Sequence, residues 1–530
     1  MLATNRKKEI SAILMETIDK PTAHLLAGLL KARGVRHIVV SPGSRCAPLT
    51  VVFARSGHFE LHPVIDERTA AFVALGMSLA TDTPVVALCT SGSALLNYAP
   101  ALSEAYYRRV PVIAVTADRP AAMIDQRDSQ TVRQPHALDA VVRKCVDIPD
   151  EHSETALQMA SRLINDALIA ATGHIPGPVH INMQFEMPLT PETPVAPAIS
   201  CRSICVHRSA PACDFAPVIE SIPAGCNVLV ALGGMHVGSD EAALLRSLPL
   251  AVYAEAQSNV AIPNYGIDNF AGLPPVDVLV TAGGAIISDS FKRWLRQTPS
   301  LRHISLGFDD NCIDTYGALT DIVECRPTDF LKALAQAGVS SPAFIGSWRN
   351  ALDAFKARDA RNTVWELIET LAHNAGPEAV VHVSNGMAAR YAQKVDFLPG
   401  QRIEMNRGVS GIEGATSTAV GDAIVNGRRP TLLISGDMSA AYDISALSIE
   451  WLPDNFRMVV LDNDGGDIFR TVRTTAQLPE RERFFTMPPK LPLSELAAAY
   501  GLKYFTSPDE FMKCGTKSLL HVKVTQGKLD

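Results

Sequence analysis

Several features that would assign this chain to a specialised class are absent from its sequence. No uninterrupted apolar run approaches the roughly 18 residues that a membrane-spanning helix requires. The opening segment, MLATNRKKEISAILMETIDK, is partly basic but has neither an apolar core nor the small-residue cleavage site of a signal peptide. We therefore expect no membrane insertion, and a cytoplasmic location follows by default.

An excess of charge of one sign is absent as well. The 48 lysines and arginines nearly balance the 55 aspartates and glutamates, so the net charge is only −7. A chain with this balance has no general attraction for nucleic acid or for an anionic membrane surface. Any site for an anionic small molecule must therefore be a local cluster of basic side chains.

A pattern of paired cysteines is also missing. The ten cysteines are scattered, as is usual for reduced thiols in a large intracellular protein. One cluster contains Cys201, Cys205, His207 and Cys213, but its segment is rich in proline and serine. Because the spacing also fits common zinc sites poorly, we interpret this segment as a loop.

What the sequence does contain is a repeated alternation of strand-like and helix-like segments. In residues 1–187, apolar segments such as PVVALCTSGS and VPVIAVTADRP end in polar turns and alternate with helical patterns. The proline-rich segment 188–213 is typical of an extended linker, and two further α/β blocks follow at residues 214–345 and 362–530. This alternation predicts an α/β fold of three doubly wound, mainly parallel-sheet domains, with the central one as a scaffold.

The third block contains the strongest chemical signal. The apolar segment TLLIS runs into Gly436 and Asp437, and the next, FRMVVLD, leads to Asn463 and the pair Gly465-Gly466. About one helix and one strand separate the two motifs, so both should meet at the carboxyl edge of a parallel sheet. A carboxylate, an amide oxygen and a turn carbonyl suit Mg²⁺, and the glycines let the backbone approach a diphosphate closely.

Either motif alone is more often a plain turn. Two such motifs, each after a strong strand and one crossover apart, resemble the two-part diphosphate–Mg²⁺ motif of thiamine-diphosphate enzymes. Glu67, in DERTAAFVALG, fits the same interpretation, because thiamine chemistry needs a carboxylic acid against the pyrimidine ring of the cofactor. The simpler alternative is an exposed glutamate in the first turn of a helix, where the helix dipole favours it.

Further motifs occur in order along the chain and are more specific. They are SPGSRCAPLT, DERTAAFVALG, TSGSALLNYAPALSEA, TADRPAAMIDQRDSQTVRQPHAL, MNRGVSGIEG, SGDMSAAYDISAL and DNDGGDIF. Together they resemble the 2-succinyl-5-enolpyruvyl-6-hydroxy-3-cyclohexene-1-carboxylate synthases of menaquinone biosynthesis. The resemblance implies a transferase that decarboxylates 2-oxoglutarate and adds the succinyl-semialdehyde carbanion to isochorismate. Its cofactors would be thiamine diphosphate and Mg²⁺, for which Mn²⁺ can substitute.

The resemblance also assigns roles to residues that match the motifs of the family. Mg²⁺ would be held by Asp437, Asn463 and the carbonyl of Gly465, and Glu67 would activate the cofactor. Ile412 would be the apolar wedge that bends the cofactor, although plain core packing is its simpler interpretation. The first block would bind the pyrimidine ring and the third block the diphosphate. The other residues expected at the cofactor are Ser410, Gly436, Met438, Ser439, Gly466 and Ile468.

Both substrates of this family are polyanions, so the cavity needs arginines, whose planar guanidinium groups grip carboxylates with two hydrogen bonds. The residues expected to contribute to catalysis beside Glu67 are Arg45, Arg119, Gln130 and Arg407. Substrate binding is assigned to Ser44, Arg45, Arg119, Gln130, Arg390, Arg407 and Phe469. A surface ion pair is the commoner role of any one of these arginines taken alone.

Two segments depart from the family pattern. Where the family often has a Ser-Lys-Arg run, this chain has Ser288-Asp289-Ser290, with Lys292 and Arg293 displaced along a predicted helix. A helix turns about 100° per residue, so these basic groups are expected to point elsewhere. Gly386 also stands where a serine is common near the cofactor. Both departures leave the thiamine assignment intact and concern the substrate contacts.

The resemblance implies a homodimer or homotetramer with its sites between chains. Three alternatives remain open at this point. The chain could be another thiamine-diphosphate 2-oxo acid decarboxylase or an acetohydroxyacid synthase-like carboligase, or a non-catalytic relative that keeps the fold. The intact Glu67, Asp437 and Asn463 argue against the last of these. A nicotinamide oxidoreductase ranks low, because no strand-placed G-x-G-x-x-G precedes a ribose-binding acid.

Overall fold

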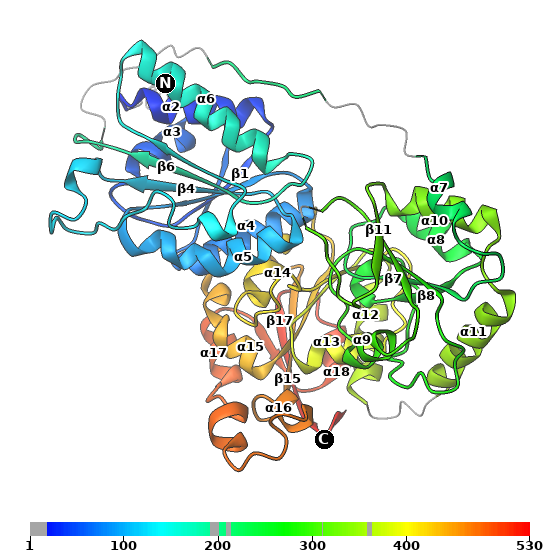
Figure 1. The fold of residues 1–530 in the computed structure, drawn as a ribbon. Coiled ribbons are helices and arrows are strands. Elements are labelled where there is room, and N and C mark those ends of the chain that lie inside the picture. Colours follow the sequence, from blue (N-terminus) through cyan, green and yellow to red (C-terminus); the bar gives the residue numbers. More distant parts are fainter. Residues whose placement is uncertain (1–17, 191–200, 208–213, 310, 358–362, 530) are drawn as a thin grey trace, which may run out of the picture. The chain divides into compact units, whose positions relative to one another are not determined.

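The fold contains three parallel α/β sheets, which confirms the predicted fold class. The computed structural model describes residues 18–190, 201–207, 214–309, 311–357 and 363–529 (Figure 1). These residues cluster into two compact units. Unit 1 contains the described chain up to residue 207 together with Ser417–Gly427 and Ser445–Trp451, and unit 2 contains the other described residues. Most of the predicted linker 188–213, including Cys213, lies outside the described residues, and the domain boundaries stay a prediction.

Unit 1 is built on a sheet in the order β2–β1–β3–β4–β6–β5, in which every neighbouring pair is parallel. Strands β3, β4 and β6 are buried along their whole length, as expected for a parallel sheet covered on both faces. The strand order reverses between β1 and β3, so the loops after these strands lie at the position where such sheets bind ligands. The strands are β1 His37–Val40, β2 Glu60–Pro63, β3 Val85–Cys89, β4 Val112–Asp118, β5 Lys144–Ile148 and β6 Val179–Gln184.

Helices cover both faces of this sheet (Figure 1). On one face α2 packs against α3 and α6, and on the other α4 packs against α5. Helix α4 is buried almost all round because segment 417–427 also packs on it. A Cβ at Gly76 would lie 2.0 Å from the carbonyl oxygen of Thr418, and one at Gly421 would lie 2.1 Å from that of Val73. The helices are α2 Pro21–Ala32, α3 Ala47–Arg55, α4 Glu67–Thr81, α5 Ala99–Arg108 and α6 Glu154–Ala171.

Unit 2 contains two sheets. The first has the parallel order β11–β10–β9–β7–β8 and corresponds to the predicted central block. Its strands are β7 Val228–Leu232, β8 Ala251–Ala254, β9 Val278–Ala282, β10 Arg302–Leu306 and β11 Leu319–Val323. The helices of this block are α7 Ala216–Glu220, α8 Ser239–Ser247, α9 Asp289–Arg296, α10 Pro327–Ala337 and α11 Pro342–Lys356.

The second sheet of unit 2 has the order β13–β12–β14–β15–β17–β16, with β18 antiparallel to β17. Its order reverses between β12 and β14, which places the loop after β14 at a ligand-binding position. The strands are β12 Val380–Val383, β13 Arg402–Glu404, β14 Thr431–Gly436, β15 Phe456–Asp462, β16 Lys503–Phe505, β17 Ser518–Thr525 and β18 Lys528–Leu529. The helices are α12 Val364–Ala375, α13 Met387–Ala392, α15 Asp437–Tyr442, α16 Ile468–Thr471, α17 Leu493–Ala499 and α18 Pro508–Met512. Helix α14 Ala415–Val425 lies almost wholly in the segment that belongs to unit 1.

The helices of the described ranges include none that combines the length and the apolar character needed to cross a bilayer.

Candidate active site

Asp437 lies where the sequence predicts it, directly after β14 and at the first position of α15. Its carboxylate is buried and turned toward the loop after the neighbouring strand β15: Oδ2 accepts a hydrogen bond of 2.7 Å from the Gly465 N–H. Oδ1 accepts one of 2.8 Å from the Met438 N–H. Burial raises the pKa of Asp437 to about 6. The two motifs therefore meet at one edge of the sheet, as expected for neighbouring parallel strands.

The loop after β15 fits a cation and a diphosphate. Asn463 Oδ1 is buried and has no hydrogen-bond partner among the described residues. A buried amide oxygen without a partner is costly, and a hard cation would satisfy it. A Cβ on Gly465, whose φ is +100°, would meet the Thr486 carbonyl oxygen at 2.1 Å, and one on Gly466 would meet the Phe469 ring at 2.6 Å. Only glycines allow the backbone this close approach.

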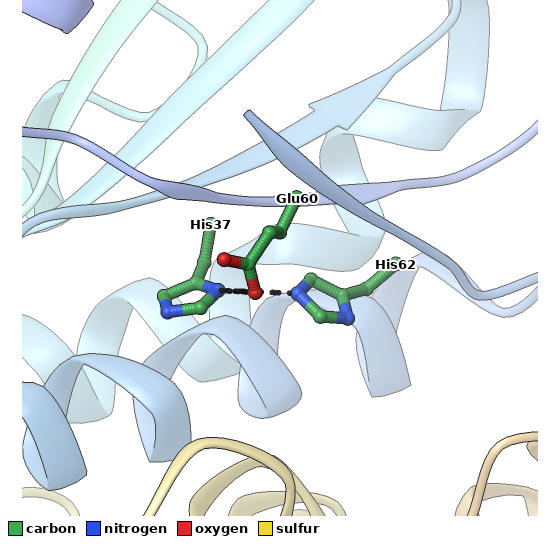
Figure 2. A group of neighbouring side chains, drawn as sticks. All are labelled: His37, Glu60 and His62. Atoms are coloured by element: carbon green, nitrogen blue, oxygen red, sulfur yellow. Dashed lines mark hydrogen bonds and ion pairs between the residues drawn. The ribbon is translucent and has the colours of Figure 1, made fainter. Parts of the chain in front are cut away.

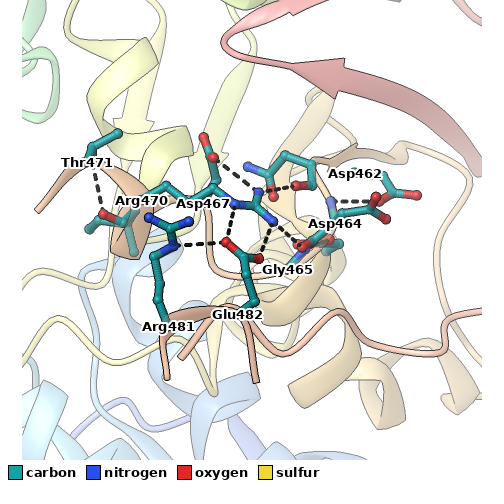
Figure 3. Close-up of polar contacts among 11 residues, drawn as sticks. Asp462, Asp464, Gly465, Asp467, Arg470, Thr471, Arg481 and Glu482 are labelled. Carbon is teal, nitrogen blue, oxygen red and sulfur yellow. Dashed lines mark hydrogen bonds and ion pairs between the residues drawn. The ribbon is translucent and has the colours of Figure 1, made fainter. Parts of the chain in front are cut away.

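One arginine that the sequence analysis did not single out holds this loop in place (Figure 3). Arg470, on α16, donates to the carbonyl oxygens of Asn463 at 3.1 Å and Asp464 at 3.4 Å. It also pairs with Asp467 at 3.3 Å and with Glu482 at 3.1 Å. The hydrogen bond from Arg470, and a further one from Arg481, lower the pKa of Glu482 to about 2.

A second contact missed from the sequence lies at the end of β15. The Asp462 carboxylate is 2.7 Å from both His521 Nε2 and Lys523 Nζ on β17. Burial raises the pKa of Asp462, but the hydrogen bonds with Lys523 and His521 outweigh it, so the net shift is downward. No sequence signal marks these residues, because a strand-end acid paired with a neighbouring strand is common in any sheet.

The motif NRG-x-SGI is held through Asn385 in the loop after β12. The side-chain N–H groups of Asn385 donate hydrogen bonds to the carbonyls of Asn406 at 2.7 Å and Gly411 at 2.6 Å. Its side-chain oxygen accepts a hydrogen bond of 2.9 Å from Arg407 Nη1. This loop thereby fixes the predicted substrate arginine Arg407. Ile412 is half-buried and accepts a hydrogen bond of 2.8 Å through its carbonyl from the Ser439 hydroxyl.

The remaining predicted residues of unit 2 vary in exposure. Ser410 is exposed with φ of +62°. Ile468 begins α16, and the neighbouring Phe469 ring lies 5.7 Å from that of Phe485. Arg390 donates a hydrogen bond of 2.9 Å to the carbonyl of Gly386 at the start of α13. Burial lowers the pKa of Arg390.

One of the displaced basic residues of α9, Lys292, has a partner on its own helix. Lys292 Nζ lies 2.8 Å from Asp289 Oδ1, one turn back on the same helix. The hydrogen bond from Lys292 lowers the pKa of Asp289, and the charges of Arg390 and Arg293 lower it further. Asp289 therefore interacts with Lys292 on its own helix and is also influenced by the charge of the predicted substrate residue Arg390.

In unit 1, Glu67 occupies the first position of α4 and is half-buried. The helix is capped by Asp66, whose Oδ1 accepts hydrogen bonds from the N–H groups of Arg68 at 3.0 Å and Thr69 at 3.3 Å. Because Asp66 satisfies the helix end, the Glu67 carboxylate is not needed as a cap. Its Oε2 accepts a hydrogen bond of 3.3 Å from the side-chain amide of Asn97.

Two predicted arginines of unit 1 influence each other. Arg45 is buried and donates 2.7 Å to the Phe185 carbonyl; burial, followed by the positive charge of Arg119, lowers its pKa. Arg119 pairs with Asp128 at 3.0 Å, while its Nε is buried without a hydrogen-bond partner among the described residues. The charge of Asp118 partly offsets the repulsion at Arg45. An anionic group bound beside both arginines would relieve this mutual repulsion.

The neutral residues predicted beside these arginines lie in adjacent loops. Ser44 is exposed in the loop after β1. Gln130, whose φ is +59°, donates a hydrogen bond of 3.1 Å from its side-chain amide to the Ser91 carbonyl in the loop after β3. A Cβ on Gly43 would lie 2.2 Å from the Thr90 side chain, so these two loops touch at the switch point of the sheet.

Comparisons with known proteins show which family the chain belongs to. A family model described as "Thiamine pyrophosphate enzyme, N-terminal TPP binding domain" matches residues 21–138. Similar proteins from Phocaeicola vulgatus, Desulfotalea psychrophila and Flavobacterium johnsoniae are 35%, 34% and 33% identical to the chain. Each is named 2-succinyl-5-enolpyruvyl-6-hydroxy-3-cyclohexene-1-carboxylate synthase. The matches cover 88%, 89% and 92% of this chain and 87%, 91% and 91% of those proteins, respectively.

Proposed function

The chain belongs to the family of 2-succinyl-5-enolpyruvyl-6-hydroxy-3-cyclohexene-1-carboxylate synthases, and on that premise we propose how its residues perform the reaction of the family. It is a thiamine-diphosphate-dependent transferase that removes CO₂ from 2-oxoglutarate and joins the remaining succinyl-semialdehyde unit to isochorismate. The observation that carries this function is the likeness to named synthases along nine-tenths of the chain, at 33% identity over 92% of it in one case.

The proposed metal is Mg²⁺, for which Mn²⁺ can substitute. Asp437, the Asn463 amide oxygen and the Gly465 carbonyl would hold it. The buried Asn463 Oδ1, which has no hydrogen-bond partner in the part of the chain that the structure describes, supports this set. The oxygen donors match the preference of Mg²⁺, which also keeps water and phosphate ligands. The loop glycines leave room for the diphosphate.

When bound, the thiamine cofactor supplies the electron sink for the decarboxylation and the new carbon–carbon bond. Glu67 would hold a proton against the pyrimidine ring nitrogen, which requires a carboxyl group that is not consumed as a helix cap. Arg45 and Arg119 would bind substrate carboxylates, with Ser44 and Gln130 as neutral hydrogen-bond partners. Arg407, whose Nη1 donates a hydrogen bond of 2.9 Å to Asn385 Oδ1, is a further proposed substrate contact. The remaining proposed contacts are Arg390, Phe469, Ser410, Ile412, Met438, Ser439 and Ile468.

The decisive experiment follows the absorbance of isochorismate with purified protein, Mg²⁺ and thiamine diphosphate. Loss of absorbance should require 2-oxoglutarate, the cofactor and the metal together, and replacing 2-oxoglutarate by pyruvate should abolish it. Release of CO₂ without consumption of isochorismate would instead indicate a simple decarboxylase. The absence of both activities, with no cofactor binding by calorimetry, would indicate a non-catalytic relative.

The proposed assembly is a homodimer or homotetramer with sites between chains, in the cytoplasm, where 2-oxoglutarate is a common metabolite. A mixing experiment tests the shared sites. Glu67→Gln and Asp437→Asn chains should each be nearly inactive alone. When the two are unfolded together and refolded, mixed dimers should regain one functional site each. If each site is built within one chain, the mixture stays inactive, while refolded wild-type protein shows that the procedure works.

A further inference from the structure

A cluster of two histidines and one glutamate lies on unit 1 and contains none of the residues assigned to the reaction (Figure 2). His37 begins β1, and Glu60 and His62 belong to β2, the edge strand of the sheet. The parallel register pairs His37 with Glu60 and Val39 with His62. Because side chains alternate between faces along a strand, the three groups share one face and point toward one another.

The distances between these groups match those of a metal site. His37 Nδ1 lies 3.2 Å from His62 Nε2 and 3.6 Å from Glu60 Oε2. All three ligand atoms fall within 4.8 Å of one another. In a tetrahedral site with bonds of about 2.0–2.1 Å, neighbouring ligand atoms are separated by about 3.3–3.4 Å. The side chains would therefore need to move only a little to surround one ion.

The protonation states also suit a metal. Burial, followed by the charge of His37, lowers the pKa of His62 to about 4, and burial lowers that of His37. Both imidazoles are therefore neutral near pH 7, which is the form that binds metals. The two carboxylate oxygens of Glu60 have different neighbours. Oε1 lies 3.1 Å from Arg36 Nη2, whereas Oε2 faces His37. The positive charge of Arg36 would repel a metal cation at this cluster. Its salt bridge, however, uses only Oε1 of Glu60, so Oε2 is available to bind the metal.

The cluster is also accessible. The Glu60 side chain is 54% exposed and that of His37 is 15% exposed, so an ion can enter from solvent and keep a water ligand. We propose that His37, Glu60 and His62 form a binding site for a divalent transition metal, with Zn²⁺ as the fitting ion. Two imidazoles and one carboxylate, with a position left open for water, form a known zinc ligand set.

The site would act on the two strands that lead to the proposed active-site loops. Strand β1 continues to Ser44 and Arg45, and β2 continues to Glu67. A metal bound between them would fasten the edge strand to the sheet, because an ion that binds only the folded state stabilises it. This role concerns the fold of unit 1 and does not depend on the proposed reaction.

A second cluster, His136, Asp139 and Cys145, meets the same distance limit but is a weaker candidate. Its His136 and Asp139 already form an ion pair at 2.9 Å, with both side chains more than half exposed. Burial raises the pKa of Cys145 to about 11, so the thiol stays protonated near neutral pH and is a poor ligand. This cluster therefore supplies the matched control.

The test is a Zn²⁺ titration by calorimetry on the full-length chain without a histidine tag. The protein is first stripped with a chelator and then kept in saturating Mg²⁺ and thiamine diphosphate, so that the proposed cofactor site is filled. The wild type should bind one Zn²⁺ at this cluster. Glu60→Gln and His62→Gln should each weaken that binding about tenfold or more, while His136→Gln should leave it unchanged.

A local probe distinguishes this cluster from other sites. Trp451 lies 5.1 Å from the His62 ring, so bound Ni²⁺ should quench part of the tryptophan fluorescence. Trp451→Phe should remove that quenching but keep Zn²⁺ binding. Glu60 is half exposed, so Glu60→Gln is expected to fold even if His62→Gln does not. No Zn²⁺ binding by the wild type, or equal binding by wild type and Glu60→Gln, overturns the proposal.

Discussion

Two carboxylates of similar chemistry are given different environments in this chain. Glu67 is half-buried at a helix start that Asp66 already caps, whereas Asp437 is buried and accepts two backbone hydrogen bonds. The first is thereby left available to a ligand, and the second is fixed in direction. This difference supports a proton-holding role for Glu67 and a metal-holding role for Asp437.

For Glu67 we predict that substitution by Gln lowers turnover by about 10²–10⁴-fold, the usual contribution of a positioned acid or base. Binding of Mg²⁺ and cofactor should persist, because other residues hold the metal and the diphosphate. The assay is isochorismate consumption, with cofactor affinity measured by calorimetry. Glu154→Gln is the matched control, since Glu154 also follows the capping residue of a helix in unit 1. Equal loss of activity in both variants would contradict a specific role.

For Asp437 we predict a pH-dependent metal affinity. Its pKa of about 6 means that protons compete with Mg²⁺ below that pH, so metal-dependent cofactor binding should weaken there by up to about tenfold per pH unit. The negative charge of Asp462 contributes to the raised pKa. Asp462→Asn should therefore move the transition to lower pH, whereas the protonation of thiamine diphosphate itself is the same with both proteins. An identical pH profile for the two proteins would refute this prediction.

At the scale of elements, the loop after β15 and helix α16 are held together by the contacts of one arginine. Arg470 joins them by binding the carbonyls of Asn463 and Asp464 while pairing with Asp467 and Glu482 (Figure 3). Such a contact orients a metal loop without touching the metal, and contacts of this kind commonly change metal affinity by about 10–100-fold.

We therefore predict that Arg470→Gln weakens Mg²⁺-dependent cofactor binding by at least about tenfold and leaves the fold intact. Arg481→Gln is a close control, because Arg481 binds the same Glu482 at 2.8 Å but does not contact the carbonyls of Asn463 or Asp464. Cofactor titrations at several Mg²⁺ concentrations measure the effect. If higher Mg²⁺ does not restore binding in Arg470→Gln, the loss lies outside the metal loop and the assigned role is wrong.

The sequence predicts some of these contacts and not others for physical reasons. The meeting of Asp437 and Gly465 follows from parallel neighbouring strands, whose carboxyl ends share an edge, and the start of α4 at Glu67 follows from the Asp66 cap. The contacts of Arg470 and Asn385 could not be predicted, because they bind backbone carbonyls, which every residue carries. The ion pair of Lys292 with Asp289 follows from their i,i+3 spacing on one helix, whereas the direction in which α9 faces is fixed only by packing.

At the scale of the whole molecule, the sheet of unit 1 encloses a network of buried polar groups. In unit 1, Asn182 on β6 donates to Asp118 at 3.0 Å and to Asp147 at 2.8 Å, and accepts from Thr116 and Gln134, each at 2.8 Å. His180 joins the network through Thr116 at 2.7 Å. Because the Asp118 carboxylate also accepts a hydrogen bond of 2.8 Å from the Arg119 N–H, this buried network positions a proposed substrate loop.

The buried histidine makes unit 1 sensitive to acid. Burial lowers the pKa of His180 to about 4 from the ordinary value of 6.5, so below pH 6.5 the unfolded chain takes up a proton that the folded chain excludes. The free energy of unfolding should therefore fall as the pH drops from 6.5 to about 4, by up to about 3 kcal/mol for this group. His180→Gln should lose this contribution while retaining a group able to bond Thr116. Urea unfolding of the wild type and the variant at several pH values measures it, and parallel pH dependences for the two would show that His180 is not the titrating group.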